Sequence, residues 1–219
     1  PPVDSVMEKF SYDGEILVKG PTVFQGYFNN PAENRAAFTD DGFYRTGDTG
    51  HFDEDGYLVL TGRLKDRILL SSGRDVRPRN IEKHFEREFL FDYFCVVGDG
   101  RPYTAALVCP NFTALRQYAR DHHIEFTEER ELAHHPEIER LFKKKIDEVN
   151  GLLASYEQVR KFKLMPERFT IESGEITPTF KLRRLFIHEK YRDVIDSMYP
   201  SSVKVIDAAY ESKEEEGEV

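Results

Sequence analysis

The sequence predicts an α+β protein, in which a β-rich first part is followed by a mixed part with a small sheet flanked by helices. Residues 15–64 carry short apolar runs separated by turns, which is typical of strands. From residue 111 onward, apolar residues recur at helical spacing. The pattern changes near Lys65, and we therefore place a boundary there.

The β-rich part contains one clear hairpin signal and one short helix. The sequence D-E-D-G at residues 53–56 lies between two apolar runs and predicts a hairpin turn. Asn30 is placed to cap a helix, and Pro31 suits its first position. The helix is expected to interrupt a series of strands.

The mixed part opens with residues 62–82, which read G-R-L-K-D-R-I-L-L-S-S-G-R-D-V-R-P-R-N-I-E. They predict a short buried strand, a tight loop at Ser71-Ser72-Gly73, and a helix that Pro78 opens and that continues through Phe89. Two apolar runs at 94–97 and 104–109 follow and predict a β-hairpin.

The remaining elements are mainly helical. Asn111 is expected to cap one helix, and Pro136 opens a longer one with apolar residues at helical spacing. Residues 161–165 predict a strand, and residues 182–198 predict one final amphipathic helix. Residues 201–219 are expected to form a solvated acidic tail.

Composition excludes several classes of function. The net charge of −9 argues against sequence-independent nucleic-acid binding, which needs a basic face. Cys95 and Cys109 lie in apolar runs and are expected to be buried reduced thiols, which favours a cytosolic location. No apolar run approaches the ~20 residues that a membrane helix needs, and peripheral membrane contact is left open.

Three blocks in a fixed order carry a family resemblance. They are Tyr44-Arg45-Thr46-Gly47-Asp48, residues 62–82, and residues 176–184, which read I-T-P-T-F-K-L-R-R. Together they resemble the C-terminal motifs of the adenylate-forming superfamily, and most closely those of AMP-forming long-chain fatty acid CoA ligases. The resemblance covers nearly all of residues 14–199.

The resemblance implies a division into three parts. Residues 1–64 correspond to the last part of the large adenylation domain, a β-subdomain, residues 65–200 correspond to the C-terminal lid domain, and residues 201–219 form the tail. The chain begins Pro1-Pro2 without an initiating Met, and the family's phosphate loop has no counterpart in it. We therefore expect a piece of a longer enzyme that is inactive alone.

The activity that the resemblance implies is that of an ATP-dependent acyl-CoA synthetase. The larger enzyme would use ATP, Mg²⁺ and CoA to activate a fatty acid through an acyl-adenylate, with small molecules as partners and no nucleic acid. Two alternatives stay open, namely a ligase that passes the acyl group to a carrier protein and a free-standing binding module.

Both a structural and a functional interpretation are open for Asp48, Arg63 and Lys65. An Asp in a turn usually satisfies backbone N–H groups, whereas the resemblance implies that Asp48 accepts hydrogen bonds from the ribose hydroxyls of ATP or AMP. Arg63 forms either a surface ion pair with Asp66 or another nearby acid, or a contact with ribose and phosphate. The resemblance places Lys65 at the hinge between two catalytic conformations.

Lys181 is the residue to which the resemblance assigns catalysis. It would meet the acyl carboxylate and the α-phosphate during adenylation, whereas without the family it is one cation of a basic helix start. Many relatives have Gly before this lysine, and here the residue is Phe180. Gly73 and Arg74 correspond to the loop that faces the CoA channel. The pairs His122-His123 and His134-His135 lack a recognisable ligand spacing, and we expect no metal site there.

Overall fold

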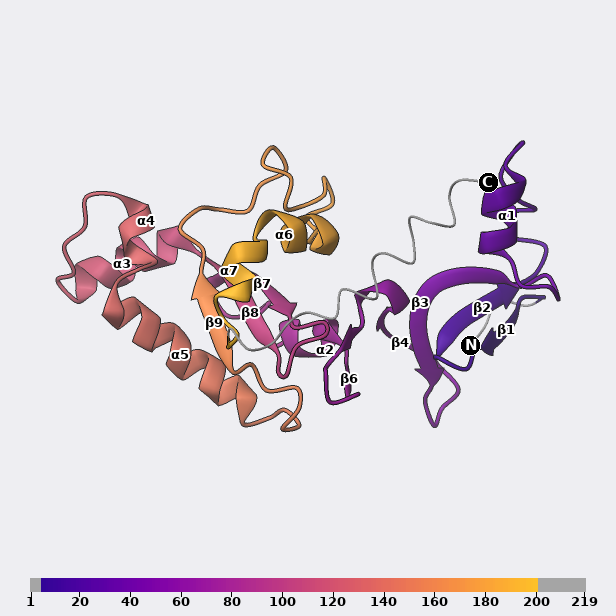
Figure 1. Ribbon diagram of the computed structural model, residues 1–219, viewed down its shortest axis with the longest axis horizontal. Coiled ribbons are helices and arrows are strands. Elements are labelled where there is room, and N and C mark those ends of the chain that lie inside the picture. The colour runs from indigo at the N-terminus through magenta and orange to yellow at the C-terminus, as the bar shows by residue number, and fades with distance from the viewer. Residues whose placement is uncertain (1–4, 201–219) are drawn as a thin grey trace. The chain divides into compact units, whose positions relative to one another are not determined.

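The computed structural model describes residues 5–200. The chain divides into two compact units between Arg67 and Ile68. Strands and helices are mixed in the chain, which confirms the α+β class (Figure 1). The expected acidic tail at 201–219 lies outside the described residues. Each unit is described by itself below.

Unit 1 is built on a four-stranded antiparallel sheet in the order β1-β2-β3-β4. The strands are β1 (Met7–Phe10), β2 (Glu15–Lys19), β3 (Tyr44–Phe52) and β4 (Leu58–Arg63). The predicted hairpin turn between β3 and β4 is confirmed. Asp53 closes it by accepting hydrogen bonds from the backbone N–H groups of Asp55 at 3.1 Å and Tyr57 at 2.7 Å.

Helix α1 (Pro31–Ala37) interrupts the strands as predicted. The Asn30 side chain accepts a hydrogen bond from the N–H of Glu33 at 3.2 Å, so the expected cap is confirmed. A short 3₁₀ helix, η1 (Leu64–Asp66), follows β4. Among residues 5–67, Ile16 and Leu17 are the hydrophobic residues that are fully buried, which makes the core of this unit thin.

Unit 2 begins with a small hairpin of β5 (Ile68–Leu69) and β6 (Asp75–Val76), followed by helix α2 (Pro78–Glu82). Pro78 opens α2 as predicted, but the expected continuation to Phe89 is wrong. After Glu82 the chain forms successive turns because Phe85 is drawn into the core, where its ring stacks on Phe94 at 3.8 Å. Phe89 is left 72% exposed.

The central sheet of unit 2 has the order β7-β8-β9. Its strands are β7 (Phe91–Val97), β8 (Ala105–Pro110) and β9 (Lys161–Leu164). The predicted hairpin of β7 and β8 is confirmed, and β9 joins β8 in parallel. Cys95 and Cys109 are buried and free, as expected.

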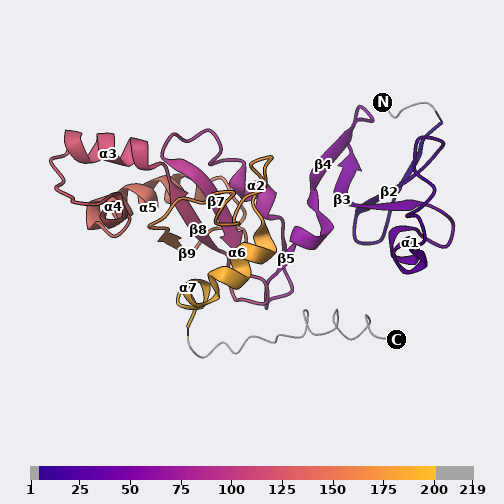
Figure 2. The same ribbon diagram turned by 90° about the horizontal axis from the view of Figure 1, so that it is seen from above.

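Alternate residues of this sheet enter two separate cores. Phe94, Val96 and Val108 pack into one cluster with helices α2, α3 (Phe112–Asp121), α4 (Glu129–Leu132) and α5 (Pro136–Asn150). Cys95, Val97 and Leu107 pack into the other cluster with α6 (Arg184–Lys190) and α7 (Arg192–Asp196). Figures 1 and 2 show the sheet between α5 and the α6–α7 segment.

The predicted starts of two helices are confirmed, and one predicted helix is wrong. Asn111 accepts a hydrogen bond from the N–H of Ala114 at 3.1 Å, and Pro136 is the first residue of α5. The single helix expected over 182–198 is divided at Tyr191, whose hydroxyl donates to Glu175 at 2.8 Å and holds the chain out of helical conformation. None of the helices in the described residues combines the length and apolar character that crossing a bilayer requires.

Candidate functional site

Asp48 and Arg63, two of the predicted nucleotide-binding residues, are neighbours in the structure. They lie opposite each other on β3 and β4. The Nε atom of Arg63 is 3.1 Å from Oδ1 of Asp48, and the two side chains are 64% and 36% exposed. An exposed ion pair contributes about 0–1 kcal/mol to stability. The pair is therefore accessible to a ligand and makes only a small contribution to the fold.

The backbone around Asp48 is shaped by an irregularity where β3 pairs with β2. Gly47 has a φ of +70° and donates its N–H to the buried carboxylate of Glu15 at 2.9 Å. The Thr46 hydroxyl donates to the carbonyl of Ile16 at 2.7 Å and accepts from the N–H of Asp48 at 3.1 Å. These bonds fix where the Asp48 side chain leaves the sheet.

The chemistry of this pair suits a ribose phosphate. A carboxylate accepts several hydrogen bonds, so it can serve two neighbouring hydroxyl groups at once. A guanidinium carries a fork of donors that fits phosphate oxygens. Arg63 uses Nε toward Asp48, and its terminal nitrogens are the groups that would face a phosphate.

Lys181 is exposed and lies at the end of a tight turn in unit 2. The N–H of Thr177 donates to the carbonyl of Lys181 at 2.9 Å, and the Thr177 hydroxyl accepts from the N–H of Lys181 at 3.1 Å. A bridge between Ile176 and Leu182 closes the turn at its base. Phe180, which precedes the lysine, has a φ of +58° and a side chain that is 68% exposed.

The segment before this turn is held by Glu175, which is 1% exposed. Its carboxylate accepts hydrogen bonds from Lys190 Nζ at 2.5 Å, from the Tyr191 hydroxyl at 2.8 Å, and from Ser173. Burial raises the pKa of this carboxyl, but the hydrogen bonds from Lys190, Ser173 and Tyr191 outweigh that effect and lower it to about 2. The Lys181 turn therefore starts from a fixed, charged anchor.

Gly73 and Arg74 form the connection between β5 and β6. Gly73 has a φ of +77°, and its N–H donates to the carbonyl of Leu70 at 2.8 Å. An added Cβ would meet no atom within 4 Å, so the glycine is required by backbone conformation and not by crowding within the described residues. The Arg74 guanidinium lies 5.5 Å from the centre of the Tyr156 ring.

Lys65 is an exposed residue of η1, next to the point where the two compact units meet. The residues on both sides of η1, Arg63 and Arg67, have extended backbones with ψ of 141° and 139°. Asp48, Arg63 and Lys65 thus belong to unit 1, whereas Gly73, Arg74 and Lys181 belong to unit 2.

Three buried carboxylates of the site were missed by sequence reasoning. Glu15 holds Gly47, Glu175 holds the segment before Lys181, and Glu82 pairs with Arg184 just after Lys181. They are 4%, 1% and 5% exposed. Each adjoins an isoleucine in the sequence, but no sequence pattern around these acids shows that their carboxylates are buried.

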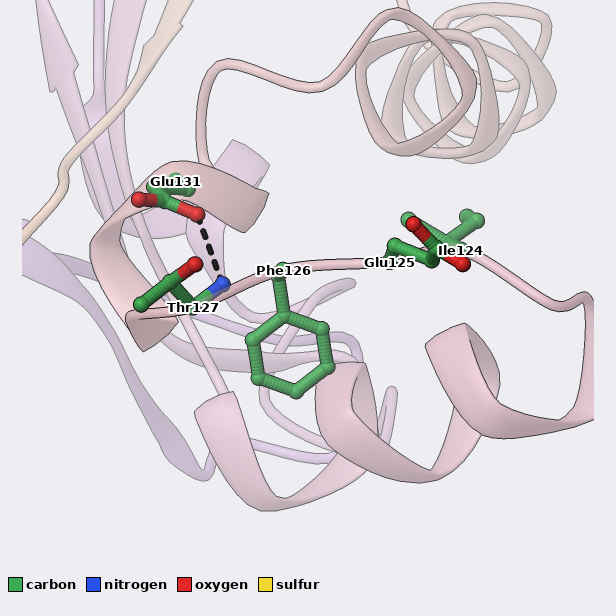
Figure 3. A pocket seen from close by; sticks show the side chains of 5 residues that line it. All are labelled: Ile124, Glu125, Phe126, Thr127 and Glu131. Atoms are coloured by element: carbon green, nitrogen blue, oxygen red, sulfur yellow. Dashed lines mark hydrogen bonds between the residues drawn. The ribbon is translucent and has the colours of Figure 1, made fainter.

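A hollow of about 530 Å³ lies between α3 and α4 and contains none of the predicted site residues. It is lined by Ile124, Glu125, Phe126, Thr127 and Glu131. Figure 3 shows the hydrogen bond from the Thr127 N–H to the Glu131 carboxylate, at 2.8 Å. Two acidic side chains disfavour phosphate, so we assign no nucleotide or CoA to this hollow.

Comparison with known proteins assigns the chain to a family. The family described as AMP-binding enzyme C-terminal domain matches residues 65–203. The chain belongs to this family of adenylate-forming enzymes. The match confirms the resemblance that the motifs around Gly73 and Lys181 indicated.

Individual relatives of this adenylate-forming chain are consistent with that assignment. A long-chain fatty acid CoA ligase of Mycobacterium tuberculosis, FadD15, is 34% identical over 199 residues, or 90% of this chain and 33% of its own length. Long-chain fatty acid CoA ligase 1 of Cavia porcellus is also 34% identical, over 88% of this chain and 28% of its own length. The chain thus spans about a third of the length of the curated relatives it matches.

A solved structure shares the fold. The adenylation domain of a carboxylate reductase from Mycobacterium chelonae superimposes with a TM-score of 0.73 at 26% identity. The alignment covers 90% of this chain and 31% of that domain. Both units of the described chain therefore follow elements found in an adenylating enzyme.

Proposed function

We propose that this chain is the C-terminal part of an ATP-dependent, AMP-forming acyl-CoA synthetase that acts on long-chain fatty acids. The observation that carries the proposal is the exposed pair of Asp48 and Arg63, side by side on β3 and β4. The long-chain ligases among the relatives support the choice of substrate.

Three residues receive roles in the first half-reaction. Asp48 accepts hydrogen bonds from the ribose hydroxyls, and Arg63 donates to ribose and phosphate oxygens. Lys181 supplies positive charge where the fatty acid carboxylate attacks the α-phosphorus of ATP. A new oxygen–phosphorus bond forms, and pyrophosphate leaves.

In the second half-reaction the CoA thiol attacks the acyl carbon of the adenylate, and AMP leaves. Gly73 and Arg74 would border the path of the CoA arm. Mg²⁺ accompanies the chemistry of ATP in such enzymes. Residues 5–200 contain no cluster of His, Cys, Asp and Glu that fits a metal ion, so we assign Mg²⁺ no ligand among them.

The two parts of the chain receive separate roles in this proposal. Residues 1–64 act as a β-subdomain of the adenylation domain, and residues 65–200 act as the lid. Lys65 is the hinge, since it is exposed on a 3₁₀ turn with extended residues on both sides. The lid would present Lys181 for adenylation and the Gly73 loop for thioester formation.

A second candidate keeps adenylation and changes the acyl acceptor to a carrier protein. It is favoured by the structural similarity to an enzyme that is a carboxylate reductase and not a CoA ligase. Incubation of the full-length protein with ATP and a fatty acid, followed by CoA or a phosphopantetheinylated carrier, separates the two. Acyl-CoA as the product supports the first candidate, and acyl-carrier as the product supports the second.

Residues 1–219, produced alone, are expected to form no acyl-CoA, because catalysis needs substrates held in register and the family's phosphate loop has no counterpart in these residues. The measurement is thioester formation from palmitate, ATP and CoA, with full-length protein as the positive control. Acyl-CoA formation by the chain alone, free of host ligase, would contradict this expectation. Absence of adenylate formation by the full-length protein would refute the proposed function.

A further inference from the structure

A buried ion pair joins the end of α2 to the first residue of α6. Glu82 closes α2, and its carboxylate contacts the guanidinium of Arg184. Their side chains are 6% and 18% exposed, so the pair is far more protected than the surface pairs of this chain. Burial makes the contact specific, because neither charge is easily left without the other.

The same pair also fixes both helices to the central sheet. Val96 lies on β7, an edge strand of that sheet. Its N–H donates to the Glu82 carboxylate at 2.9 Å, and its carbonyl accepts from Arg184 Nη1 at 3.5 Å. Two side chains thus occupy the backbone groups that a neighbouring strand would use.

The position of Arg184 in the sequence gives this contact its significance. Only Leu182 and Arg183 separate it from Lys181. On the other side of the turn, the N–H of Arg183 donates to the carbonyl of Glu175 at 2.8 Å. The chain is therefore held in place on both sides of the Lys181 turn, at Glu175 before it and at Arg184 after it.

We propose that Glu82 and Arg184 are positioning residues for Lys181. They hold the base of its turn against the edge of the β7-β8-β9 sheet while α2 fixes the carboxylate. The inference rests on the proposed function, because it assumes that Lys181 acts in adenylation. A flexible Lys side chain acts at a defined point only if its backbone is held, and small misplacements of catalytic groups can cost about 10²-fold in rate.

The competing interpretation is that the ion pair only stabilises the fold. A positioning role works through Lys181, so its loss has no effect once the lysine has been removed. If the ion pair is purely structural, its loss lowers the adenylation rate independently of Lys181. The fold-loss in the double variant is then the product of the two single fold-losses. Non-additivity of two substitutions therefore separates the two interpretations.

The experiment uses the full-length protein and single-turnover formation of acyl-adenylate. Glu82→Gln keeps an acceptor for Val96 and removes the charge, and it is expected to slow adenylation about 10-fold. Lys181→Ala is expected to slow it about 100-fold. The double variant should match Lys181→Ala within about twofold. A double variant about 10-fold slower than Lys181→Ala would overturn the positioning role.

A matched control exists on the segment that follows α2. Glu86 pairs with Arg79 through side chains that are 47% and 61% exposed. Glu86→Gln removes the same charge from an exposed pair and is expected to leave the adenylation rate within about twofold of the wild type. If Glu86→Gln lowered the adenylation rate as much as Glu82→Gln does, removal of any negative charge from this region would explain the slowing. That result would overturn the inference.

Arg184→Lys provides a second test of the ion pair in case Glu82→Gln does not fold. It keeps the positive charge but loses the fork that reaches both Glu82 and the Val96 carbonyl. Thermal unfolding identifies the folded variants, and the same comparison with Lys181→Ala is then made for Arg184→Lys. Wild-type protein that forms no adenylate refutes the proposed function. An active wild type with additive losses refutes this inference alone.

Discussion

Phe180 holds a backbone conformation that is unfavourable for a residue with a bulky side chain. Its φ of +58° lies in the left-handed region, which glycine enters most readily. Its ring is 68% exposed, so packing offers little compensation. The turn itself therefore favours glycine at this position, and Phe180 keeps the turn at a cost in free energy.

Phe180→Gly is expected to stabilise the protein slightly or leave it unchanged, within about 1 kcal/mol. Relief of left-handed strain of about 1–2 kcal/mol is partly offset by the greater entropy of glycine in the unfolded chain. Phe180→Val should destabilise, because a β-branched side chain tolerates this conformation less well. Chemical denaturation measures both. A Gly variant that loses more than about 1 kcal/mol would show that the ring packs against another group.

Lys181→Ala in the full-length protein is expected to separate the two half-reactions. Adenylation should slow about 10²-fold or more, since a positioned cation is lost where negative charge develops. Thioester formation from supplied acyl-adenylate should be unaffected. Single-turnover kinetics measures both steps. Equal slowing of both steps would argue against a role confined to adenylation, and no slowing of adenylation would remove the catalytic role.

At the scale of elements, local signals were predictable and long-range ones were not. Asn30, Asn111 and Pro136 mark helix starts by short-range chemistry, and each acts as the sequence predicted. The early end of α2 and the break at Tyr191 depend on partners far along the chain, namely the Phe94 ring and the Glu175 carboxylate. No pattern confined to the helix itself carries that information.

The anchor formed by Glu175 predicts a specific dependence of stability on pH. Its pKa of about 2 in the folded protein lies below the ordinary value of 4.5, so the folded state releases this proton more readily than the unfolded state. The stabilisation is present above about pH 4.5 and is lost as the pH falls toward 2.

Glu175→Gln is therefore expected to lower the free energy of unfolding at pH 7 and to flatten its decline between pH 4.5 and 2. Urea denaturation at a series of pH values measures this. Glu189→Gln, an exposed residue of α6, provides the control and should retain the wild-type slope. Parallel pH profiles for wild type and Glu175→Gln would contradict the low pKa.

At the scale of the whole molecule, the site divides into a part that motifs reveal and a part that they do not. Asp48 and Arg63 could be found from the sequence, since both belong to motifs, and the structure brings them into contact. Glu15, Glu82 and Glu175 could not, because a carboxylate becomes an anchor only through burial, and burial depends on the complete fold. The roles of Asp48, Arg63 and Lys181 stay predictions.

The connection between the two units offers a test of the hinge. Lys65 is exposed, and the compact units meet after Arg67. We expect trypsin to cleave native protein after Lys65 or Arg67 before it cleaves after Lys143 or Lys144, which lie inside α5. Timed digestion with mass analysis measures the order. Substitution of both connecting residues by Gln should remove the early cleavage, and early cleavage within α5 would argue against a hinge at Lys65.

The contacts at Val96 also affect how far the edge of the central sheet is open to other chains. A sheet edge with free backbone groups invites strand pairing between molecules and leads toward aggregation. On the β9 edge, Lys161 and Lys163 are exposed and charged, which disfavours such pairing. On the β7 edge, Glu82 and Arg184 occupy the backbone of Val96. Loss of the ion pair would free the N–H and the carbonyl of Val96, and we expect this to make the β7 edge more open to pairing with another chain.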